Sequence, residues 1–83
     1  MIIYKVTETL VEIDKAGGEG YFSSLHKAQD AILKRVAEVY TEEEMKHFKF
    51  TGGGYQYETF GNEDIFDCLY EIEELVLDEF YAD

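Results

Sequence analysis

The chain has few residues that interrupt secondary structure, form disulfides or balance negative charge. It has no proline and no tryptophan, and only seven of its 83 residues are basic, against 19 acids. Its single cysteine, Cys68, has no second cysteine in the chain with which to form a disulfide, a usage that fits a reducing cytoplasm. These absences exclude an internal disulfide framework and predict a fold that packing alone stabilises.

Long apolar segments are also missing. No apolar run approaches the roughly 20 residues that cross a bilayer, and the start of the chain lacks the basic region and apolar run of a signal peptide. The hydrophobic fraction of 46% is nevertheless enough for a compact core. We therefore expect one soluble cytoplasmic domain that spans residues 1–83.

The motifs of catalysis, phosphate binding and metal binding do not occur. No GxGxxG or GxxxxGK[ST] motif is present, and no lysine follows Gly52–Gly54. Glu43 and His47 share a helical spacing, but two ligands are too few for a zinc site. Carboxylates beside Cys68 disfavour a reactive thiolate. We therefore predict no enzyme activity, no cofactor and no metal.

The first part of the chain predicts two strands and a helix. Residues 2–13 are rich in β-branched and apolar types, and their alternation slips near residues 8–10, which indicates a long strand with a bulge. The glycine-rich segment 14–20 is typical of a turn, so that Tyr21 and Phe22 return as a short second strand. Ser23 or Ser24 then caps a helix that runs to about residue 40, with an apolar side formed by Leu25, Ala28, Ile32, Val36 and Val39.

The second part of the chain predicts a similar arrangement. A capping-box pattern opens a short helix, two strands follow around a glycine turn, and an asparagine caps a final helix. In chain order these elements are Thr41–His47, Phe48–Thr51, Gly52–Gly54, Tyr55–Phe60 and 63–81. The predicted fold is therefore α+β, a small antiparallel sheet of about four strands with two main helices on one face, in the order ββα, short α, ββα.

Charge is distributed unevenly along the chain. Residues 1–49 contain all seven bases and nine acids, whereas residues 50–83 contain ten acids and no base, so most of the net charge of −12 lies in the second part. Such a charge repels nucleic acids and anionic membranes. We expect no direct binding to nucleic acid or membrane, and a basic protein as the partner.

The predicted final helix gathers carboxylates on one side. On a helical wheel its acidic ridge (Glu63, Asp64, Asp67, Glu71, Glu74 and Asp78) falls within an arc of about 100°, opposite an apolar side that would pack on the sheet. Tyrosine is enriched where proteins bind proteins. The expected partner-binding residues are Glu63, Asp64, Asp67, Tyr70, Glu71, Glu74, Asp78, Tyr81, Tyr55 and Tyr57.

The ridge costs stability. Like charges four residues apart destabilise a helix by about 0.2–0.5 kcal/mol per pair, and acids near the end of a helix oppose its dipole. Mixed signs would avoid this cost, so stability does not explain the pattern. Two interpretations stay open: the ridge binds a basic partner, or it only keeps the protein soluble.

Two resemblances bear on these interpretations. The segment from Gly20 to Ile32, after a predicted strand and turn, resembles the hairpin-then-helix openings of small phage proteins. The whole chain, which is short and acidic with an acidic final segment, is similar in type to anti-restriction, anti-CRISPR and DNA-mimic proteins of phages and mobile elements. The resemblance implies an inhibitor in the host bacterial cytoplasm. Because those proteins share no motif, it carries over no residue roles.

Three functions follow as hypotheses. The first is an inhibitor that blocks the basic, nucleic-acid-binding surface of a host defence or nucleic-acid enzyme through the acidic ridge. The second is a homo-oligomeric regulatory or structural module, such as a homodimer, that uses exposed aromatics or a sheet edge. The third is sequestration of a nucleotide signal, for which the candidate phosphate donors are Lys5, Lys34, Arg35, Lys46 and Lys49.

Overall fold

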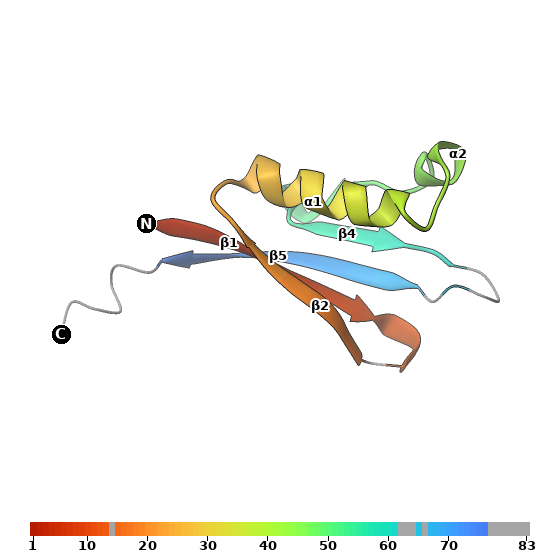
Figure 1. Cartoon of the computed structure of the whole chain (residues 1–83), viewed down its shortest axis with the longest axis horizontal. Helices are drawn as coiled ribbons and strands as arrows, with labels where there is room; N and C mark the ends of the chain where they lie inside the picture. The colour runs from red at the N-terminus through yellow and green to blue at the C-terminus, as the bar shows by residue number, and fades with distance from the viewer. Residues whose placement is uncertain (14, 62–64, 66, 77–83) are drawn as a thin grey trace.

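The fold is a five-stranded antiparallel sheet with its helices on one side (Figure 1). The computed structural model describes residues 1–13, 15–61, 65 and 67–76. The strands are ordered β2-β1-β5-β4-β3, so the last strand of the chain lies at the centre of the sheet. Of the helices in the described part of the chain, none is long and apolar enough to cross a bilayer. The α+β class and the antiparallel sheet are confirmed. The expected four strands and two main helices are corrected: the described residues form five strands, one long helix and one short helix, in the order ββα, short α, βββ.

The first hairpin is longer than the sequence predicts. β1 (Ile2–Leu10) is followed by the 3-10 turn η1 (Val11–Ile13) and by β2 (Lys15–Phe22), and the register shifts between Glu8 and Thr9, as the predicted bulge requires. The prediction of a turn over residues 14–20 is wrong, because the glycines lie within β2. At Gly17 a Cβ would overlap the Glu8 side chain, so close approach and not a turn accounts for the glycine.

Helix α1 (Leu25–Ala37) covers one side of the sheet. The Ser24 hydroxyl accepts a hydrogen bond from the Lys27 amide at 3.2 Å, which confirms the predicted cap. Ala28, Ile32 and Val36 are buried, as their spacing predicts. Val39 is exposed instead of packed, because the helix has already ended.

The elements that follow α1 agree with the sequence in kind. α2 (Glu42–Met45) opens with a complete capping box between Thr41 and Glu44. β3 (Phe50–Thr51) and β4 (Gln56–Thr59) pair around the turn η2 (Gly52–Gly54), whose three glycines all have positive φ. Only glycine adopts three such conformations in succession without strain.

The predicted final helix is wrong over residues 68–76. These residues form β5 (Cys68–Val76), which pairs with β1 from Ile2 opposite Val76 to Leu10 opposite Cys68, and with β4 on its other side. The segment also fits a strand, because apolar and acidic residues alternate in it and Tyr70 and Ile72 are buried between exposed acids. Hydrogen bonding to a strand on each side stabilises the strand over the helix. Ile65 and Asp67 are not helical either, and positions 63, 64, 66 and 77–81 of the predicted helix lie outside the described residues.

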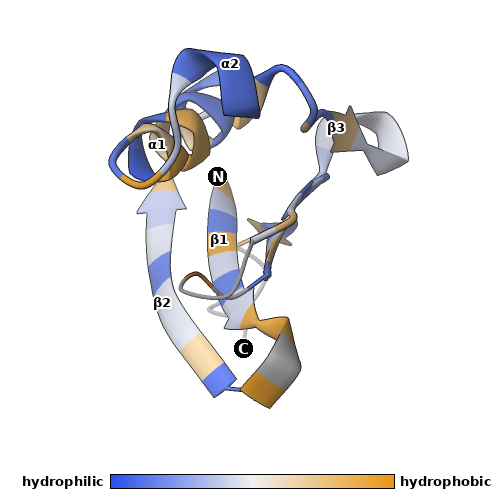
Figure 2. Cartoon of the chain, turned by 90° about the vertical axis from the view of Figure 1, so that its right-hand side faces the viewer, coloured by the Kyte–Doolittle hydropathy of each residue, from blue (hydrophilic) through white to orange (hydrophobic). Residues whose placement is uncertain are grey.

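The core lies between α1 and the sheet. Its buried apolar residues come from α1, the segment after it, and three neighbouring strands: Val6, Ala28, Ile32, Val36, Tyr40, Tyr57, Tyr70 and Ile72. Three of the seven tyrosines therefore serve the core, where Tyr57 packs against Tyr70 with ring centroids 6.4 Å apart. The other face of the sheet has no helix over it among the described elements (Figures 1 and 2).

Candidate functional site

The side of the sheet away from α1 is an uncovered surface with a defined set of side chains. Successive side chains of a strand point to opposite faces of the sheet, so each strand residue next to a core residue lies on the side away from α1. The register between strands brings these residues together on one surface. We call this surface the open face. It comprises Ile3, Lys5, Thr7, Thr9, Glu19, Tyr21, Gln56, Glu58, Leu69, Glu71, Glu73 and Leu75.

Carboxylates dominate the charge of the open face. Glu19, Glu58, Glu71 and Glu73 are all exposed. They lie on β2, β4 and β5, and Lys5 on β1 is the only base of the set. The ammonium nitrogen of Lys5 lies 3.5 Å from the Glu19 carboxylate, and Lys5 is also directly opposite Glu73 in the register. The open face therefore keeps an excess of negative charge.

Apolar side chains flank these carboxylates. Ile3 lies opposite Leu75 near one end of β5, and Leu69 lies near the other end, each only partly buried. Tyr21, on β2, is 56% exposed. Partly exposed apolar groups therefore lie next to the acidic side chains of the open face.

The structure separates the described carboxylates of the predicted acidic ridge. Glu71 lies on the open face, whereas Glu74 is on the helix side and accepts a hydrogen bond from the Tyr55 hydroxyl at 2.5 Å. Asp67 is partly buried and accepts the Gly61 amide at 2.5 Å. A continuous ridge through these three residues is therefore wrong, because a strand sends successive side chains to opposite faces. Glu63, Asp64, Asp78 and Tyr81 lie outside the described residues.

The tyrosines predicted as exposed anchors are mostly in the core. Tyr57 is 2% exposed and Tyr70 is 4% exposed, so neither side chain is available to a partner in this fold. Tyr55 is partly buried, and its hydrogen bond to Glu74 raises the pKa of Tyr55 to about 12. The sequence reasoning missed Tyr21, together with Glu19, Glu58 and Glu73; the alternation of residues 70–73 was the signal for Glu73.

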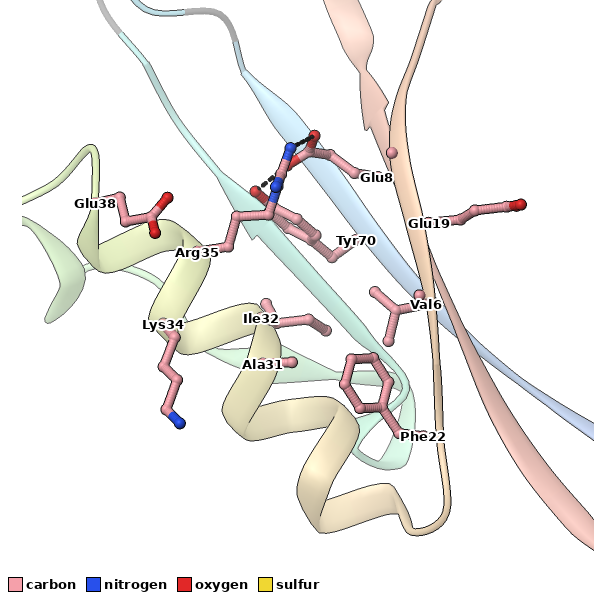
Figure 3. Close-up of a pocket in the computed structure, with 12 residues that line it drawn as sticks. Val6, Glu8, Glu19, Phe22, Ala31, Ile32, Lys34, Arg35, Glu38 and Tyr70 are labelled. Atoms are coloured by element: carbon pink, nitrogen blue, oxygen red, sulfur yellow. Dashed lines mark hydrogen bonds and ion pairs between the residues drawn. The ribbon is translucent and has the colours of Figure 1, made fainter.

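A partly buried ion pair joins α1 to the sheet on the helix side (Figure 3). Arg35 donates to Glu8 through Nε to Oε2 at 2.7 Å and through Nη2 to Oε1 at 3.0 Å, and the Tyr70 hydroxyl donates to Oε2 at 2.5 Å. The Glu8 side chain is 10% exposed, whereas Arg35 is 55% exposed. The carboxylate is thus satisfied by three donors, as burial of a charge requires.

These contacts change the pKa of both Glu8 and Tyr70. Chiefly the hydrogen bonds from Arg35 hold the pKa of Glu8 below its usual range, against the opposing effect of burial. Burial and the neighbouring Glu8 carboxylate raise the pKa of Tyr70. The cluster therefore stays ionised at Glu8 and protonated at Tyr70 at neutral pH, which is the state that ties α1 to β1 and β5.

The bases named for nucleotide binding are dispersed in the structure. Lys5 lies on the open face beside Glu19, and Arg35 is engaged with Glu8 on the helix side. Lys46 pairs with Glu43 on α2, with 3.0 Å between Nζ and Oε1. The sheet thus separates Lys5 from Arg35, and a phosphate site made of the whole set has no geometric basis.

Metal ligands do not cluster in the described part of the chain. Among those residues, no group of three or more histidine, cysteine, aspartate or glutamate side chains could hold a metal ion.

The chain matches no protein-family model, no curated protein and no solved structure. The functional argument therefore rests on the arrangement of its own residues.

Proposed function

We propose that the chain is an acidic binding protein that docks its open face against a basic surface of another protein. The observation that supports this most is the concentration of four exposed carboxylates, with one base, on the side of the sheet that the described helices leave uncovered. A two-layer domain gains nothing in its own packing from that arrangement. A basic partner would neutralise the carboxylates and cover the partly exposed apolar groups beside them.

The spacing of the carboxylates fits a surface that otherwise binds nucleic acid. Glu71 and Glu73 are two residues apart on β5, which separates them by about 6.7 Å along the strand. Phosphates of one DNA strand rise by about 3.4 Å along the helix axis per nucleotide, so the Glu71–Glu73 pair covers about the axial rise of two nucleotides. We therefore propose a nucleic-acid-handling or defence enzyme as the partner, and steric inhibition as the mode of action. The resemblance in type to phage inhibitors points to the same class.

A pull-down from nuclease-treated bacterial lysate tests this proposal. The tagged protein is compared at about 0.1 M and about 0.5 M salt, because attraction between exposed charges weakens with ionic strength. The test variant changes Glu58, Glu71 and Glu73 to Gln. A matched control changes Asp30 to Asn and Glu42 and Glu43 to Gln, which alters the same charge on the helices.

The two variants separate the open face from overall charge. We expect the wild type and the control to capture the same basic protein at low salt and to release it at high salt, and the open-face variant to capture none. Equal capture by both variants would contradict the proposal. Capture that does not respond to salt would also contradict it.

A homo-oligomeric module is the second candidate. The observation in its favour is the partly exposed apolar set on the open face, with Tyr21 on the outer strand. Tyr57, one of the expected partner-binding residues, is buried and does not serve such an interface. Light scattering distinguishes this candidate: a dimer mass that persists at about 0.5 M salt and is lost in Tyr21→Ser favours it over a basic partner.

A further inference from the structure

The outer edge of β2 is long and accessible. β2 is the terminal strand of the sheet, eight residues long, and within the described residues it pairs only with β1. The other terminal strand, β3, has only two residues. An edge of this length presents backbone donors and acceptors to which a further strand can pair.

An apolar groove runs between this edge and α1 (Figure 3). Its volume is about 380 Å³. Val6, Phe22, Ala31 and Ile32 supply its apolar wall, and Figure 3 shows Ile32, Val6 and Phe22 converging between the helix and the strands. The Glu8–Arg35 pair lies at one end of the groove. A side chain placed here would lose water without meeting an unpaired buried charge.

Missing side chains on β2 keep the groove open. A Cβ at Gly18 would lie 3.6 Å from Nη2 of Arg35, which is an ordinary van der Waals distance, so the packing does not require glycine there. Gly17 is different, because a Cβ there would overlap Glu8. Gly18 and Gly20 both line the groove. Their lack of side chains leaves space that a side chain of another chain can fill.

The charges around the edge select the chemistry of the occupant. A strand added to β2 would direct alternate side chains to the helix side, over the groove, and the others to the open face, beside Glu19. Three carboxylates (Glu8, Glu19 and Glu38) and two bases (Lys34 and Arg35) line the groove, and Arg35 is paired with Glu8. The groove therefore has a small excess of acid, and the chain as a whole carries −12. The complementary strand is apolar at every second position and basic at the positions between.

We propose that β2 and α1 form a docking groove for an extended segment of a partner protein that alternates basic and apolar residues and adds to the sheet as a sixth strand. Main-chain pairing with β2 supplies affinity, and the groove accepts the apolar side chains. This site shares only Glu19 with the carboxylates of the open face, and it stands whether or not the proposal for that face holds.

The direct test uses a seven-residue peptide that alternates lysine and valine. Its binding to the isotope-labelled protein is followed by amide chemical shifts and hydrogen exchange. A second peptide of the same composition, with its valines in one block, controls for charge attraction alone. We expect saturable binding of the alternating peptide, with exchange protection along β2 and shifts in α1 from Ala31 to Arg35.

Two substitutions fill the groove from opposite walls. Gly18→Val introduces a β-branched side chain from the strand, and Ala31→Leu introduces a longer one from the helix. Because each occupies the space of a buried apolar side chain, each is expected to weaken the alternating peptide about tenfold or more. Thr51→Val, at the opposite edge of the sheet, is the matched control and should leave binding unchanged. Circular dichroism verifies that each variant is folded.

The proposal is overturned if the block peptide binds as well as the alternating one, or if both folded groove variants bind like wild type. Shifts confined to the open face would overturn it too, since they would report charge attraction only. The Glu58, Glu71 and Glu73 variant keeps saturable peptide binding with β2 protection if the groove is the site. Peptide binding by this variant therefore tests the groove independently of the open-face proposal.

Discussion

Acidic residues differ in burial and pairing between the two sides of the sheet. On the helix side, Glu8 is buried and receives three hydrogen bonds, two of them from Arg35. On the open face, Glu58, Glu71 and Glu73 are exposed beside a single base, Lys5. A buried charge must be paired to fold at all, whereas an exposed group of like charges is tolerated without being favoured. The first arrangement ties α1 to the sheet, and the second forms the surface that we propose binds a partner.

The largest expected effect comes from breaking the pair on the helix side. Arg35→Leu leaves the Glu8 carboxylate buried with Tyr70 as its remaining donor. Breaking a buried pair typically costs about 3–5 kcal/mol, and because Arg35 is 55% exposed we expect a smaller loss, about 2 kcal/mol, in the free energy of unfolding. Urea denaturation measures it. Lys34→Leu, at the neighbouring position of α1, is the control and should change stability by less than about 0.5 kcal/mol. Equal losses in the two variants would contradict the role of the pair.

Acid should destabilise the protein through Glu8 on the helix side. The pKa of Glu8 is lowered in the folded state, so its contribution to stability is present above the unfolded-state pKa and is lost as pH falls through the folded-state pKa. We expect stability to fall as pH is lowered from about 5 towards 3 in wild type, and to fall less in Glu8→Gln. An identical pH profile for both proteins would exclude Glu8 as the source.

Neutralising the open face should not destabilise the fold. In the Glu71→Gln and Glu73→Gln double variant, the loss of repulsion is expected to raise the free energy of unfolding by a few tenths of a kcal/mol at low salt. The gain should disappear at about 0.5 M salt, because screening removes the same repulsion. A loss of about 1 kcal/mol or more would show that these carboxylates stabilise the fold, and the comparison between the two sides would fail.

The smallest expected effect is on the titration of Tyr55, which contacts Glu74, an exposed acid of β5 on the helix side. The Tyr55 hydroxyl donates to Glu74, and the pKa of Tyr55 is raised to about 12. Absorbance titration should therefore show one tyrosine near that value, and Glu74→Gln should bring it back towards its ordinary range. An unchanged titration in Glu74→Gln would mean that the contact does not form in solution.

Local signals in the sequence predicted both described helices well, because caps and periodicity act over a few residues. Ser24 and the Thr41–Glu44 capping box specify their helix starts directly. The prediction failed at residues 68–76, where Tyr70, Ile72 and the acids between them fit both a helical and a strand period. Pairing with β1, some sixty residues earlier in the chain, decides that choice, and no local pattern reports it.

The candidate site was predictable only in its charge. The excess of acids after residue 49 is visible in the sequence, but which carboxylates share a surface depends on the period of the segment that carries them. The strand period puts Glu71 with Glu73 and sends Glu74 to the other side. Glu19 joins them only through the register between β1 and β2. The Glu8–Arg35 pair, 27 residues apart, likewise depends on how α1 crosses the sheet.

Displacement of labelled duplex DNA from the captured partner tests the central claim most directly. We predict that the wild type and the helix-side control variant (Asp30→Asn, Glu42→Gln, Glu43→Gln) displace the DNA at about 0.1 M salt, and that the open-face variant (Glu58→Gln, Glu71→Gln, Glu73→Gln) does not. Equal displacement by all three proteins would contradict the claim that the open face occupies a nucleic-acid-binding surface.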